Sequence, residues 1–467
     1  MLKLADILAA TGGQLAARGA DEFTRVSIDS RTIKSGELFI PLKGDRFDGH
    51  DFVMDSLKIC DGILVNSSWA ENIEFSAGKT VIKVDDTLLA LQELACFIRK
   101  RFRGPVIAVV GSNGKTTTKE LISSVLGTSF KVLKTEGNLN NHIGMPLCIT
   151  RADEDTGAMV LEMGTNRPGD VDLLCKIALP DIGVITNIGA EHLEGFGSME
   201  AVRDAELEIL PYLKKTVLNG DDAFLIGGLS LKFTGPIVTF GISEKENDIT
   251  AGEIVSTGNG CSFSIHTYAG KVSIQSQLSG RFNIYNSLAA CAVAHTLGLG
   301  LDRIKEGLEA FGGVKMRFEI KRIGRITFIY DVYNANPSSM KASIEELVSI
   351  ANKRPAGSRS IAVLGDMLEL GNFSIDAHKE IGNILKNKGI DLFIGVGPLM
   401  KEGVSTFGRN ASAVETADDA GKLLTDQIAE GDVVLIKGSR GMKMERVMEF
   451  IEKHKDNSGM LVVTRGK

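Results

Sequence analysis

Apolar runs followed by glycine-bearing loops and amphipathic stretches recur along the middle of the chain. The run PVIAVV at 105–110 is continuously apolar, which is typical of a strand buried on both faces of a parallel sheet. It passes directly into GSNGKTTTKELISSVL, so we predict a strand, a loop and a helix in that order. The runs at 158–164 and 182–189 predict further parallel strands, and the alternation from about 248 to 278 predicts antiparallel strands.

The two ends of the chain have patterns of their own. Before residue 100, the short β-like runs ELFIPL, GILV and TVIKV lie between turn-rich loops, and the helix-like TLLALQELACFIRKRF follows them. In the last third, strand, loop and helix repeat in order, and the strands read ITFIYD, SIAVLG, LFIGVG and DVVLIKG. Open α/β sheets bind ligands at the carboxyl ends of their strands, so we expect the chemistry of this block along one edge.

We therefore predict an α/β protein of three domains. A length of 467 residues suits two to four domains of ordinary size. We place a small N-terminal α/β domain at 1–103, a central parallel-sheet domain at 104–314, and a doubly wound, Rossmann-like C-terminal domain at 315–467.

Composition narrows the class of protein. A hydrophobic content of 43%, a charged content of 24% and a net charge of -6 indicate a soluble globular protein, and no basic run favours nucleic-acid binding. Lys3 and Asp6 make the N-terminus an amphipathic helix, not a signal sequence, and no apolar segment reaches the roughly 18 residues of a membrane span. The six cysteines are dispersed, as in a reduced protein, so we expect a cytoplasmic location.

The loop after PVIAVV carries the clearest chemical signal. Glycine lets backbone amides turn toward a phosphate, a helix N-terminus adds partial positive charge, lysine neutralises phosphate oxygens and threonine can ligate Mg²⁺. The loop is shorter than the general GxxxxGK[ST] pattern, yet its place between strand and helix predicts a P-loop-type ATPase domain that binds ATP. The predicted ATP-binding residues are Gly111, Ser112, Asn113, Gly114, Lys115, Thr116 and Thr117.

Two more polar residues follow predicted strands of the same sheet. Glu162 ends the strand AMVLE, and His192 follows the strand at 182–189. A strand-end glutamate is usually a cap or ion-pair partner, and an isolated histidine is usually structural. Here both share a sheet edge with Lys115, and a carboxylate at that place could hold a cation on the phosphates.

The phosphate loop, Glu162 and His192 belong to a series of motifs whose sequences and order resemble those of the Mur ligase family. The resemblance spans essentially the whole chain, including the N-terminal SIDSRTIKSGELFIPLKGDRFDGHDF. The resemblance implies an ATP- and Mg²⁺-dependent amide ligase of peptidoglycan precursor synthesis. The chain is most similar to the family member that joins D-alanyl-D-alanine to UDP-N-acetylmuramoyl-tripeptide through an acyl phosphate. We expect the protein to be a monomer. In chain order the motifs are GSNGKTTTKE, GNLNNHIGMPL, LEMGTN, TNIGAEHLEGFGS, GRFNIYNSLAA, MRFE, YDVYNANPSSM, GDMLELG and KGSRGMKME.

The resemblance also implies residue roles. Thr116 and Glu162 match one magnesium site, His192 and Glu206 match a second, and Asn283 matches the residue that reads adenine. Arg317 and Asp331 match residues of the C-terminal domain that reach the phosphates and the nucleotide, and we expect them to bind ATP and to take part in catalysis. The UDP-substrate is expected at Ser30, Arg31, Asn140 and Asn141, although Asn-rich loops are often plain turns. The dipeptide is expected among Asn334, Asn336, Asp366, Glu369, Lys437, Ser439 and Arg440.

Three positions depart from the family pattern. Glu206 stands where the family usually has a lysine that is carbamylated to bind metal; the alternative is an exposed helix-face glutamate near Glu208. Phe282 replaces a common histidine before Asn283, and Tyr330 stands before Asp331 where two acids are frequent.

Rival functions remain open on sequence grounds. The ligase that adds the third amino acid would carry a DNPR-type signature, but residues 335–338 read ANPS. Folate polyglutamylation would leave the N-terminal domain without a role. A nucleotide-binding module without ligase chemistry is the rival from another class. Whether the tripeptide ends in lysine or diaminopimelate is not encoded in these motifs.

Overall fold

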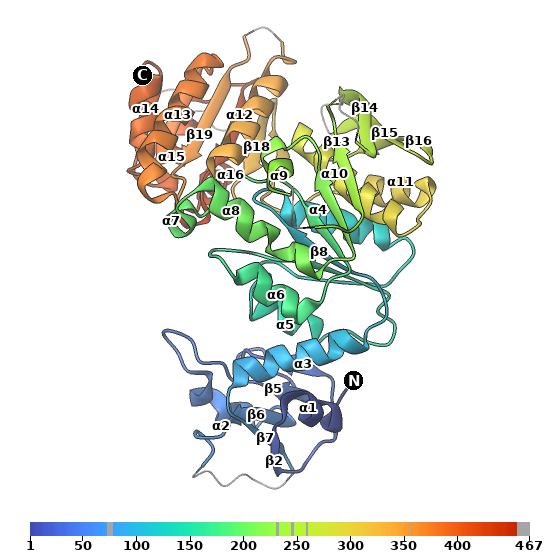
Figure 1. The fold of residues 1–467 in the computed structure, drawn as a ribbon. Helices are drawn as coiled ribbons and strands as arrows, with labels where there is room; N and C mark the ends of the chain where they lie inside the picture. The colour runs from blue at the N-terminus through green and yellow to red at the C-terminus, as the bar shows by residue number, and fades with distance from the viewer. Residues whose placement is uncertain (72–77, 230–232, 244–246, 258–259, 356, 455–467) are drawn as a thin grey trace.

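The computed structural model describes residues 1–71, 78–229, 233–243, 247–257, 260–355 and 357–454. Sheets of five, nine and six strands follow one another along the chain, each with its own helices (Figure 1). The predicted class, an α/β protein built as a small N-terminal unit, a central parallel sheet and a doubly wound C-terminal unit, is confirmed. The exact boundaries at 103/104 and 314/315 stay a prediction.

The N-terminal sheet has the strand order β2-β7-β6-β5-β4. The predicted first helix is confirmed as α1, Leu4–Thr11. Its strands are β2 Gln14–Ala17, β4 Arg25–Ser27, β5 Glu37–Phe39, β6 Gly62–Asn66 and β7 Thr80–Val84, and the pair β1 Leu2–Lys3 and β3 Glu22–Phe23 lies beside them. The remaining helices are η1 Gly49–Phe52, α2 Val53–Ser56 and α3 Thr87–Arg101.

Helix α3 contributes to two cores. Leu91 and Leu94 pack with the N-terminal sheet, whereas Ala95 packs with residues of the central sheet. At its C-terminal end, the guanidinium of Arg99 donates to the carbonyl of Ala178 at 2.7 Å. The helix therefore lies between the first two sheets and contacts both, as Figure 1 shows.

The central sheet has the order β16-β15-β14-β13-β12-β11-β8-β10-β9. It is parallel from β9 to β14 and antiparallel from β14 to β16, as the apolar runs and the alternation predicted. Its strands are β8 Val106–Val110, β9 Val132–Lys134, β10 Ala158–Glu162, β11 Ile182–Ile185, β12 Lys215–Asn219, β13 Ile237–Gly241, β14 Ile249–Ser256, β15 Cys261–Thr267 and β16 Gly270–Ser276. Its helices are α4 Lys115–Leu126, α5 Gly144–Ile149, α6 Asp170–Ala178, α7 Leu193–Phe196, α8 Met199–Glu206, η2 Leu207–Tyr212, α9 Ala223–Gly228, α10 Arg281–Thr296 and α11 Leu301–Ala310.

Strand β8 lies near the middle of this sheet, between β11 and β10. All five of its residues are fully buried because helices cover both faces of the sheet. The loops after β8, β10 and β11 consequently emerge at one edge, where the parallel strands end.

The C-terminal sheet has the order β17-β18-β22-β19-β20-β21, with only β17 antiparallel to its neighbour. Helices α12, α13 and α14 cover one face and α15 and α16 the other, which makes the sheet doubly wound. The strands are β17 Glu319–Ile323, β18 Ile326–Asp331, β19 Ser360–Gly365, β20 Leu392–Val396, β21 Ala411–Val414 and β22 Val433–Lys437. The helices are α12 Pro337–Ala351, η3 Gly371–Phe373, α13 Ser374–Asn387, α14 Met400–Phe407, α15 Ala417–Gln427, η4 Arg440–Met442 and α16 Glu445–Lys453.

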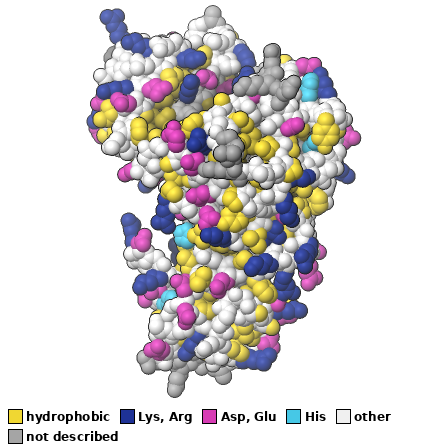
Figure 2. Space-filling view, in the orientation of Figure 1, with side chains coloured by type: hydrophobic (Ala, Val, Ile, Leu, Met, Phe, Trp, Pro, Cys, Tyr) yellow, Lys and Arg dark blue, Asp and Glu magenta, His cyan; other side chains and the backbone are white. Residues whose placement is uncertain are grey.

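The surface carries no concentration of one charge on the face drawn in Figure 2, where basic and acidic side chains are interspersed. Among the described residues, no helix has the length and apolar character needed to cross a bilayer. All six cysteines are free thiols.

Candidate active site

The loop between β8 and α4 has a conformation that glycine permits at both ends. Gly111 has φ 116° and Gly114 has φ 84°. A Cβ on Gly111 would lie 2.3 Å from Oγ1 of Thr186, and one on Gly114 would lie 2.5 Å from Oδ1 of Asn286. The loop is therefore closely packed from beneath, while the N-terminus of α4 directs unpaired amides and partial positive charge into the space above it.

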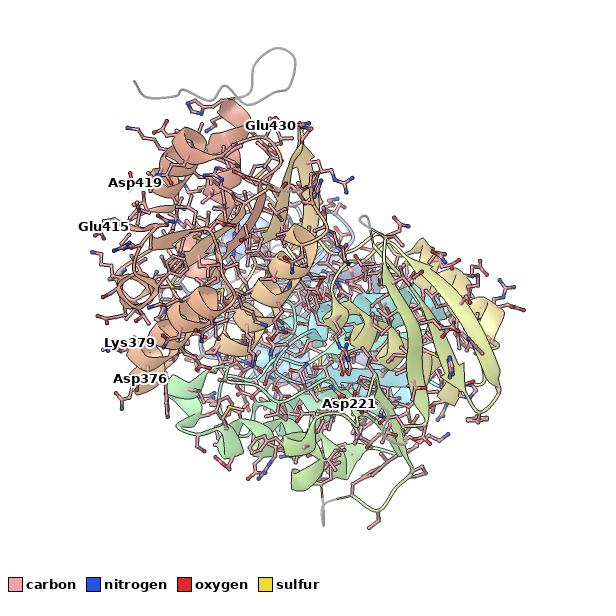
Figure 3. All side chains as sticks on the ribbon, turned by 90° about the horizontal axis from the view of Figure 1, so that it is seen from above. Asp221, Asp376, Lys379, Glu415, Asp419 and Glu430 are labelled. Carbon is pink, nitrogen blue, oxygen red and sulfur yellow. The ribbon has the colours of Figure 1, made fainter. Side chains whose placement is uncertain are left out.

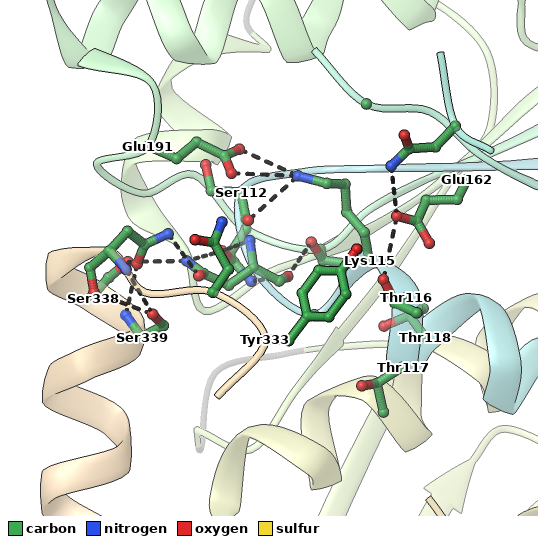
Figure 4. Close-up of a pocket in the computed structure, with 18 of the residues that line it drawn as sticks. Ser112, Lys115, Thr116, Thr117, Thr118, Glu162, Glu191, Tyr333, Ser338 and Ser339 are labelled. Carbon is green, nitrogen blue, oxygen red and sulfur yellow. Dashed lines mark hydrogen bonds and ion pairs between the residues drawn. The ribbon is translucent and has the colours of Figure 1, made fainter. Parts of the chain in front are cut away.

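Lys115 begins α4, and its ammonium group lies over the loop. Nζ donates to the carbonyl of Gly111 and lies 3.3 Å from Oε1 of Glu191 (Figure 4). Burial acts to lower the pKa of Lys115, but the carboxylates of Glu191, Glu206 and Glu162 outweigh that effect and raise the pKa. The side chain therefore stays cationic at the place predicted for phosphate oxygens.

Glu206 is completely buried beneath the same loop, so its alternative interpretation as an exposed helix-face residue is wrong. Its Oε2 accepts a hydrogen bond of 2.8 Å from the amide of Gly111. Its Oε1 is buried and has no hydrogen-bond partner among the described residues. The signal was present in the sequence: Glu206 follows Val202 by four residues, so both lie on the apolar face of α8.

Glu191 is the residue that the sequence analysis missed. It is buried between Lys115 and Glu206. Burial raises the pKa of the Glu191 and Glu206 carboxyl groups, and the ammonium of Lys115 offsets that effect only in part. Its position directly before His192 in a loop after a strand was the available signal.

Glu162 and Thr116 meet at the opposite side of Lys115, as predicted. Oε1 of Glu162 accepts hydrogen bonds from Thr116 at 3.2 Å and from Asn140 at 2.9 Å (Figure 4). The ammonium of Lys119, fully buried, lies 3.8 Å from Oε2. That Oε2 is buried without a hydrogen-bond partner among the described residues.

These orphaned carboxylate oxygens suit a hard cation, which prefers oxygen ligands. No group of three His, Cys, Asp or Glu side chains in the described ranges is spaced to hold a metal ion by itself. Mg²⁺ commonly completes its shell with phosphate oxygens and water, so Glu162 and Thr116, which line the cleft, fit a cation that arrives with a nucleotide. Glu206 is buried beneath the loop and does not line the cleft that His192 lines.

His192 lies at the same edge in a left-handed conformation, φ 49°. Its Nδ1 lies 2.6 Å from Oε2 of Glu369, a residue of the C-terminal domain. Burial lowers the pKa of His192 although Glu369 opposes the shift. A neutral imidazole fixed through Nδ1 leaves Nε2 available as a ligand.

The C-terminal domain contacts the phosphate loop directly. Nη2 of Arg317 donates to Oγ1 of Thr116 at 3.3 Å, and its guanidinium stacks 3.8 Å from the ring centre of Tyr333. Asn113 contacts both Asn336 and Ser338 through side-chain hydrogen bonds of 2.9 Å. The N-cap of α12 is thereby joined to the loop.

Asp331 has a supporting position. Its Oδ2 accepts a 2.6 Å hydrogen bond from Nζ of Lys437 and another from Ser343, while Oδ1 accepts one from the amide of Phe318. Lys437 also donates to the carbonyl of Asn334 at 3.0 Å. Asp331 thus organises the wall of the site while still lining it.

A cleft of about 720 Å³ opens above the loop between the central and C-terminal domains. Asn283 lines it and donates from Nδ2 to the carbonyl of Ser279 at 2.7 Å. Phe282 also lines it and packs edge-on against Phe318, with ring centres 4.9 Å apart. The predicted residues of the cleft that the structure brings together are Ser112, Asn113, Gly114, Lys115, Thr116, Thr117, Asn140, Asn141, Glu162, His192, Asn283, Arg317, Asp331, Asn334, Asn336 and Lys437.

Asp221 supports this cleft from behind. It accepts hydrogen bonds from the hydroxyl and the amide of Ser243, from the amide of Ile242 and from the hydroxyl of Tyr285, a cleft residue. Burial acts to raise the pKa of Asp221, but these donors outweigh it and lower the pKa to about 2. Figure 3 shows Asp221 in the central domain, apart from the labelled acids of the C-terminal domain.

Several predicted residues lie elsewhere or have structural partners. Ser30 and Arg31 lie in the N-terminal domain and do not line the cleft; Arg31 is exposed and pairs with Asp29 at 2.7 Å. Asn141 lines the cleft, but its Oδ1 accepts from the amides of Ile143 and Gly144, which is the turn role that was the alternative.

The residues proposed for the dipeptide divide in the same way. Asp366 accepts from the amides of Leu399 and Met400, so its role is structural. A second, smaller cavity adjoins the cleft, and three other candidates line it: Glu369, Ser439 and Arg440.

Comparison with known proteins gives the family. Residues 22–99 match the model of the Mur ligase family catalytic domain, 109–294 the Mur ligase middle domain, and 316–440 the Mur ligase glutamate ligase domain. The UDP-N-acetylmuramoyl-tripeptide--D-alanyl-D-alanine ligase of Bacillus subtilis is 37% identical over 91% of this chain and 92% of its own. The enzyme of the same name from Escherichia coli is 33% identical over 97% and 98%.

Solved structures agree. A crystal structure of MurF from Acinetobacter baumannii superposes with a TM-score of 0.87 at 31% identity, covering 96% of this chain and 98% of that one. MurF from Thermotoga maritima in complex with ADP superposes at 0.80 with 29% identity, covering 92% and 97%. With all three family models matched in order and relatives above 30% identity along nearly the full length, this chain belongs to the Mur ligase family.

Proposed function

We propose that this protein is an ATP-dependent ligase that joins D-alanyl-D-alanine to UDP-N-acetylmuramoyl-tripeptide in peptidoglycan precursor synthesis. The observation that carries the proposal is the single cleft shared by Lys115 of the phosphate loop and Asn334 and Asn336 of the C-terminal domain. The names of the relatives that match over nearly the whole chain support the choice of substrates. The absence of a DNPR-type signature at 335–338 disfavours the ligase that adds the third amino acid.

The reaction has two steps that balance. An oxygen of the tripeptide carboxylate attacks the γ-phosphorus of ATP, the bond to the β-phosphate oxygen breaks, and ADP leaves. The dipeptide amine then attacks the acyl carbon, loses a proton, and expels inorganic phosphate. Transfer of this kind depends mainly on positioning and on stabilising charge.

The residues have corresponding roles in this proposal. Lys115 and the amides at the start of α4 hold the β- and γ-phosphate oxygens, and Arg317 approaches from the other domain. Asn283 and Phe282 line the part of the cleft for adenine. Ser30 and Arg31 would contact the UDP group, with Asn140 and Asn141 nearer the peptide. Glu162 and Thr116, and His192 with Glu206, would hold Mg²⁺, which supplies positive charge against the phosphates.

Compartment and assembly follow from the same proposal. We propose a cytoplasmic monomer, since six free thiols suit a reducing compartment. The domain boundaries proposed from sequence are retained, at 103/104 and 314/315.

Phosphate release measured with ATP alone, and then with UDP-tripeptide and D-alanyl-D-alanine, tests the function. We expect release to require both substrates and the product mass to equal their sum minus water. Release that ignores the substrates would instead favour a plain nucleotide-binding module. Lysine- and diaminopimelate-containing UDP-tripeptides assayed side by side identify the accepted third residue, and UDP-dipeptide with a free amino acid tests the rival ligase.

A further inference from the structure

His192 takes its hydrogen-bond partner from the other domain. Its Nδ1 lies 2.6 Å from Oε2 of Glu369, which belongs to the loop after β19. A carboxylate only accepts hydrogen bonds, so the proton of the neutral imidazole lies on Nδ1 and the free lone pair on Nε2. Metal-binding histidines commonly have such a partner on the ring nitrogen that does not bind the metal. The tautomer of His192 that can bind a cation is therefore set by the C-terminal domain.

The backbone of the same loop contacts the segment that follows His192. The amide of Glu194, in the first turn of α7, donates to the carbonyl of Glu369 at 3.1 Å. The first amides of a helix have no partner within the helix, so this bond satisfies one of them from the other domain. Gly371 lies against the same turn, since a Cβ there would come 3.2 Å from Cα of Glu194. The side chain and the main chain of Glu369 thus both hold the start of α7.

Glu369 is itself held by buried groups. Its φ of 64° is a left-handed conformation, which costs free energy in a residue with a side chain and persists only where neighbouring contacts maintain it. The amide of Met367 donates to Nε2 of the fully buried His378 at 2.9 Å. The amide of Leu368 donates to the buried hydroxyl of Ser439, also at 2.9 Å. The loop is therefore fixed by the C-terminal domain before it reaches His192.

Glu162, the other proposed cation ligand with a carboxylate, has partners from its own domain. Its Oε1 accepts from Thr116 and Asn140, and Nζ of Lys119 lies 3.8 Å from its Oε2. All three partners belong to the central domain. The carboxylate of Glu162 is consequently oriented within one domain, whereas the imidazole of His192 is oriented by two.

We infer that Glu369 is a positioning residue for His192, and that the cation which His192 would hold is bound tightly only while the loop of Glu369 is docked on α7. The inference rests on the proposed function and deepens it, because it concerns one of the two proposed Mg²⁺ positions. Glu369 acts through the ring: it orients the imidazole and makes Nε2 a stronger electron-pair donor. By linkage, a cation at His192 strengthens the docking of the C-terminal domain by the same factor.

Manganese titrations that resolve the two cation positions test this assignment. The full chain is titrated with Mn²⁺ in place of Mg²⁺, with a non-hydrolysable ATP analogue and UDP-tripeptide present, and free Mn²⁺ is measured by electron paramagnetic resonance. Glu369→Ala should weaken the binding of one of two ions about tenfold or more, the usual cost of losing the outer partner of a metal-binding histidine. The other ion should bind as before. Glu369→Gln, whose amide oxygen still accepts from Nδ1, should lie between Glu369→Ala and the wild type.

Glu253→Ala is the matched control. Glu253 also has a left-handed backbone, with φ 51°, and pairs with Lys271 at 2.7 Å outside both cavities. Its side chain is 67% exposed, against 60% for Glu369. This variant should bind both ions as the wild type does. His192→Ala should lose the same ion as Glu369→Ala, and combining the two should weaken binding no further, because the carboxylate acts only through the ring.

Superimposable titrations of Glu369→Ala and the wild type overturn the inference. An equal loss of both ions also overturns it, since that indicates a general structural role, and so does a wild type that binds a single ion. If Glu369→Ala does not fold by circular dichroism, Glu369→Gln is judged by the same criteria. Each of these outcomes leaves the proposed function standing as long as the wild type joins D-alanyl-D-alanine to UDP-tripeptide. A wild type that does not ligate them refutes the proposed function, whatever its manganese binding.

Discussion

The side-chain amide of Asn336 donates a 2.9 Å hydrogen bond to Oδ1 of Asn113 across 223 residues of sequence. The same Asn336 caps α12, because its Oδ1 accepts from the amide of Ser339 at 2.8 Å. One residue therefore begins a helix of the C-terminal domain and joins that domain to the phosphate loop.

This double role gives the first prediction. Asn336→Ser should retain the cap and lose the contact with Asn113, whereas Asn336→Ala should also lose about 1 kcal/mol of helix stability. Both variants should have a lower rate of ligation, and only Asn336→Ala should have a lower melting temperature in a thermal scan. If Asn336→Ser turned over like the wild type, the contact between the domains would have no part in ligation.

Lys115→Ala should lower turnover by about a hundredfold or more, because a cation beside developing phosphate charge is lost. Phosphate release at saturating ATP is the measurement. Lys214→Ala is the control, since Lys214 is exposed, pairs with Asp181 and lies outside the cleft. Near-normal turnover of Lys115→Ala would exclude the proposed role.

Glu206→Gln should raise the magnesium concentration needed for half-maximal rate while leaving the fold intact. The amide oxygen of glutamine can still accept from the amide of Gly111, so the change removes the ionisable carboxyl group and little else. Magnesium titrations of the variant and the wild type, with thermal scans alongside, measure both effects. Superimposable titrations would remove Glu206 from the metal site.

The wild type should also be indifferent to bicarbonate, because a glutamate already carries a carboxyl group and needs no carbon dioxide to form one. Lys214 and Lys215 were the alternative sources of a carbamate if the assignment of Glu206 were shifted. Both are exposed, and Lys214 is paired with Asp181 at 2.7 Å, so neither reaches the cleft. Stimulation by bicarbonate would therefore point to a lysine that this geometry does not explain.

Asp221→Asn should make stability less dependent on pH in acid. The pKa of Asp221 is lowered to about 2 from 3.8, so its ionised form stabilises the fold above about pH 4 and that contribution disappears as pH falls toward 2. Allowing for partial exposure, the contribution is about 1 kcal/mol.

The melting temperatures of the wild type and Asp221→Asn should differ at about pH 6. They should converge as the pH falls to about 3 and below, where the carboxyl group becomes protonated in both the unfolded and the folded protein. Asp376→Asn, at the outer surface of the C-terminal domain in Figure 3, is the control and should follow the wild type. A gap that stayed constant with pH would show that Asp221 acts through packing instead of charge.

Much of this molecule could be predicted because its signals are local. The strand β8, the loop and α4 are contiguous in sequence, so Lys115 and Thr116 could be placed without tertiary information. Glu162 and His192 could be placed at the same edge because Glu162 ends one parallel strand and His192 follows another.

What could not be predicted depends on contacts between distant segments. The burial of Glu191 between Lys115 and Glu206 depends on the start of α4, the loop after β11 and the end of α8 meeting, and no spacing in the sequence encodes that meeting. The bond between Lys437 and Asp331 likewise depends on β22 lying beside β18, a neighbour relation that comes from sheet order and not from chain order.

Helix α3 holds the N-terminal and central domains in a fixed relation. Because Leu91 and Leu94 belong to the N-terminal core while Ala95 and Arg99 are anchored in the central domain, tilting one sheet against the other would expose apolar side chains and break the Arg99 hydrogen bonds. The C-terminal domain meets the loop through polar side chains such as Asn113 and Asn336, which can exchange their partners for water. We therefore expect the C-terminal domain to be the part that moves when the cleft opens, with the N-terminal and central domains staying together.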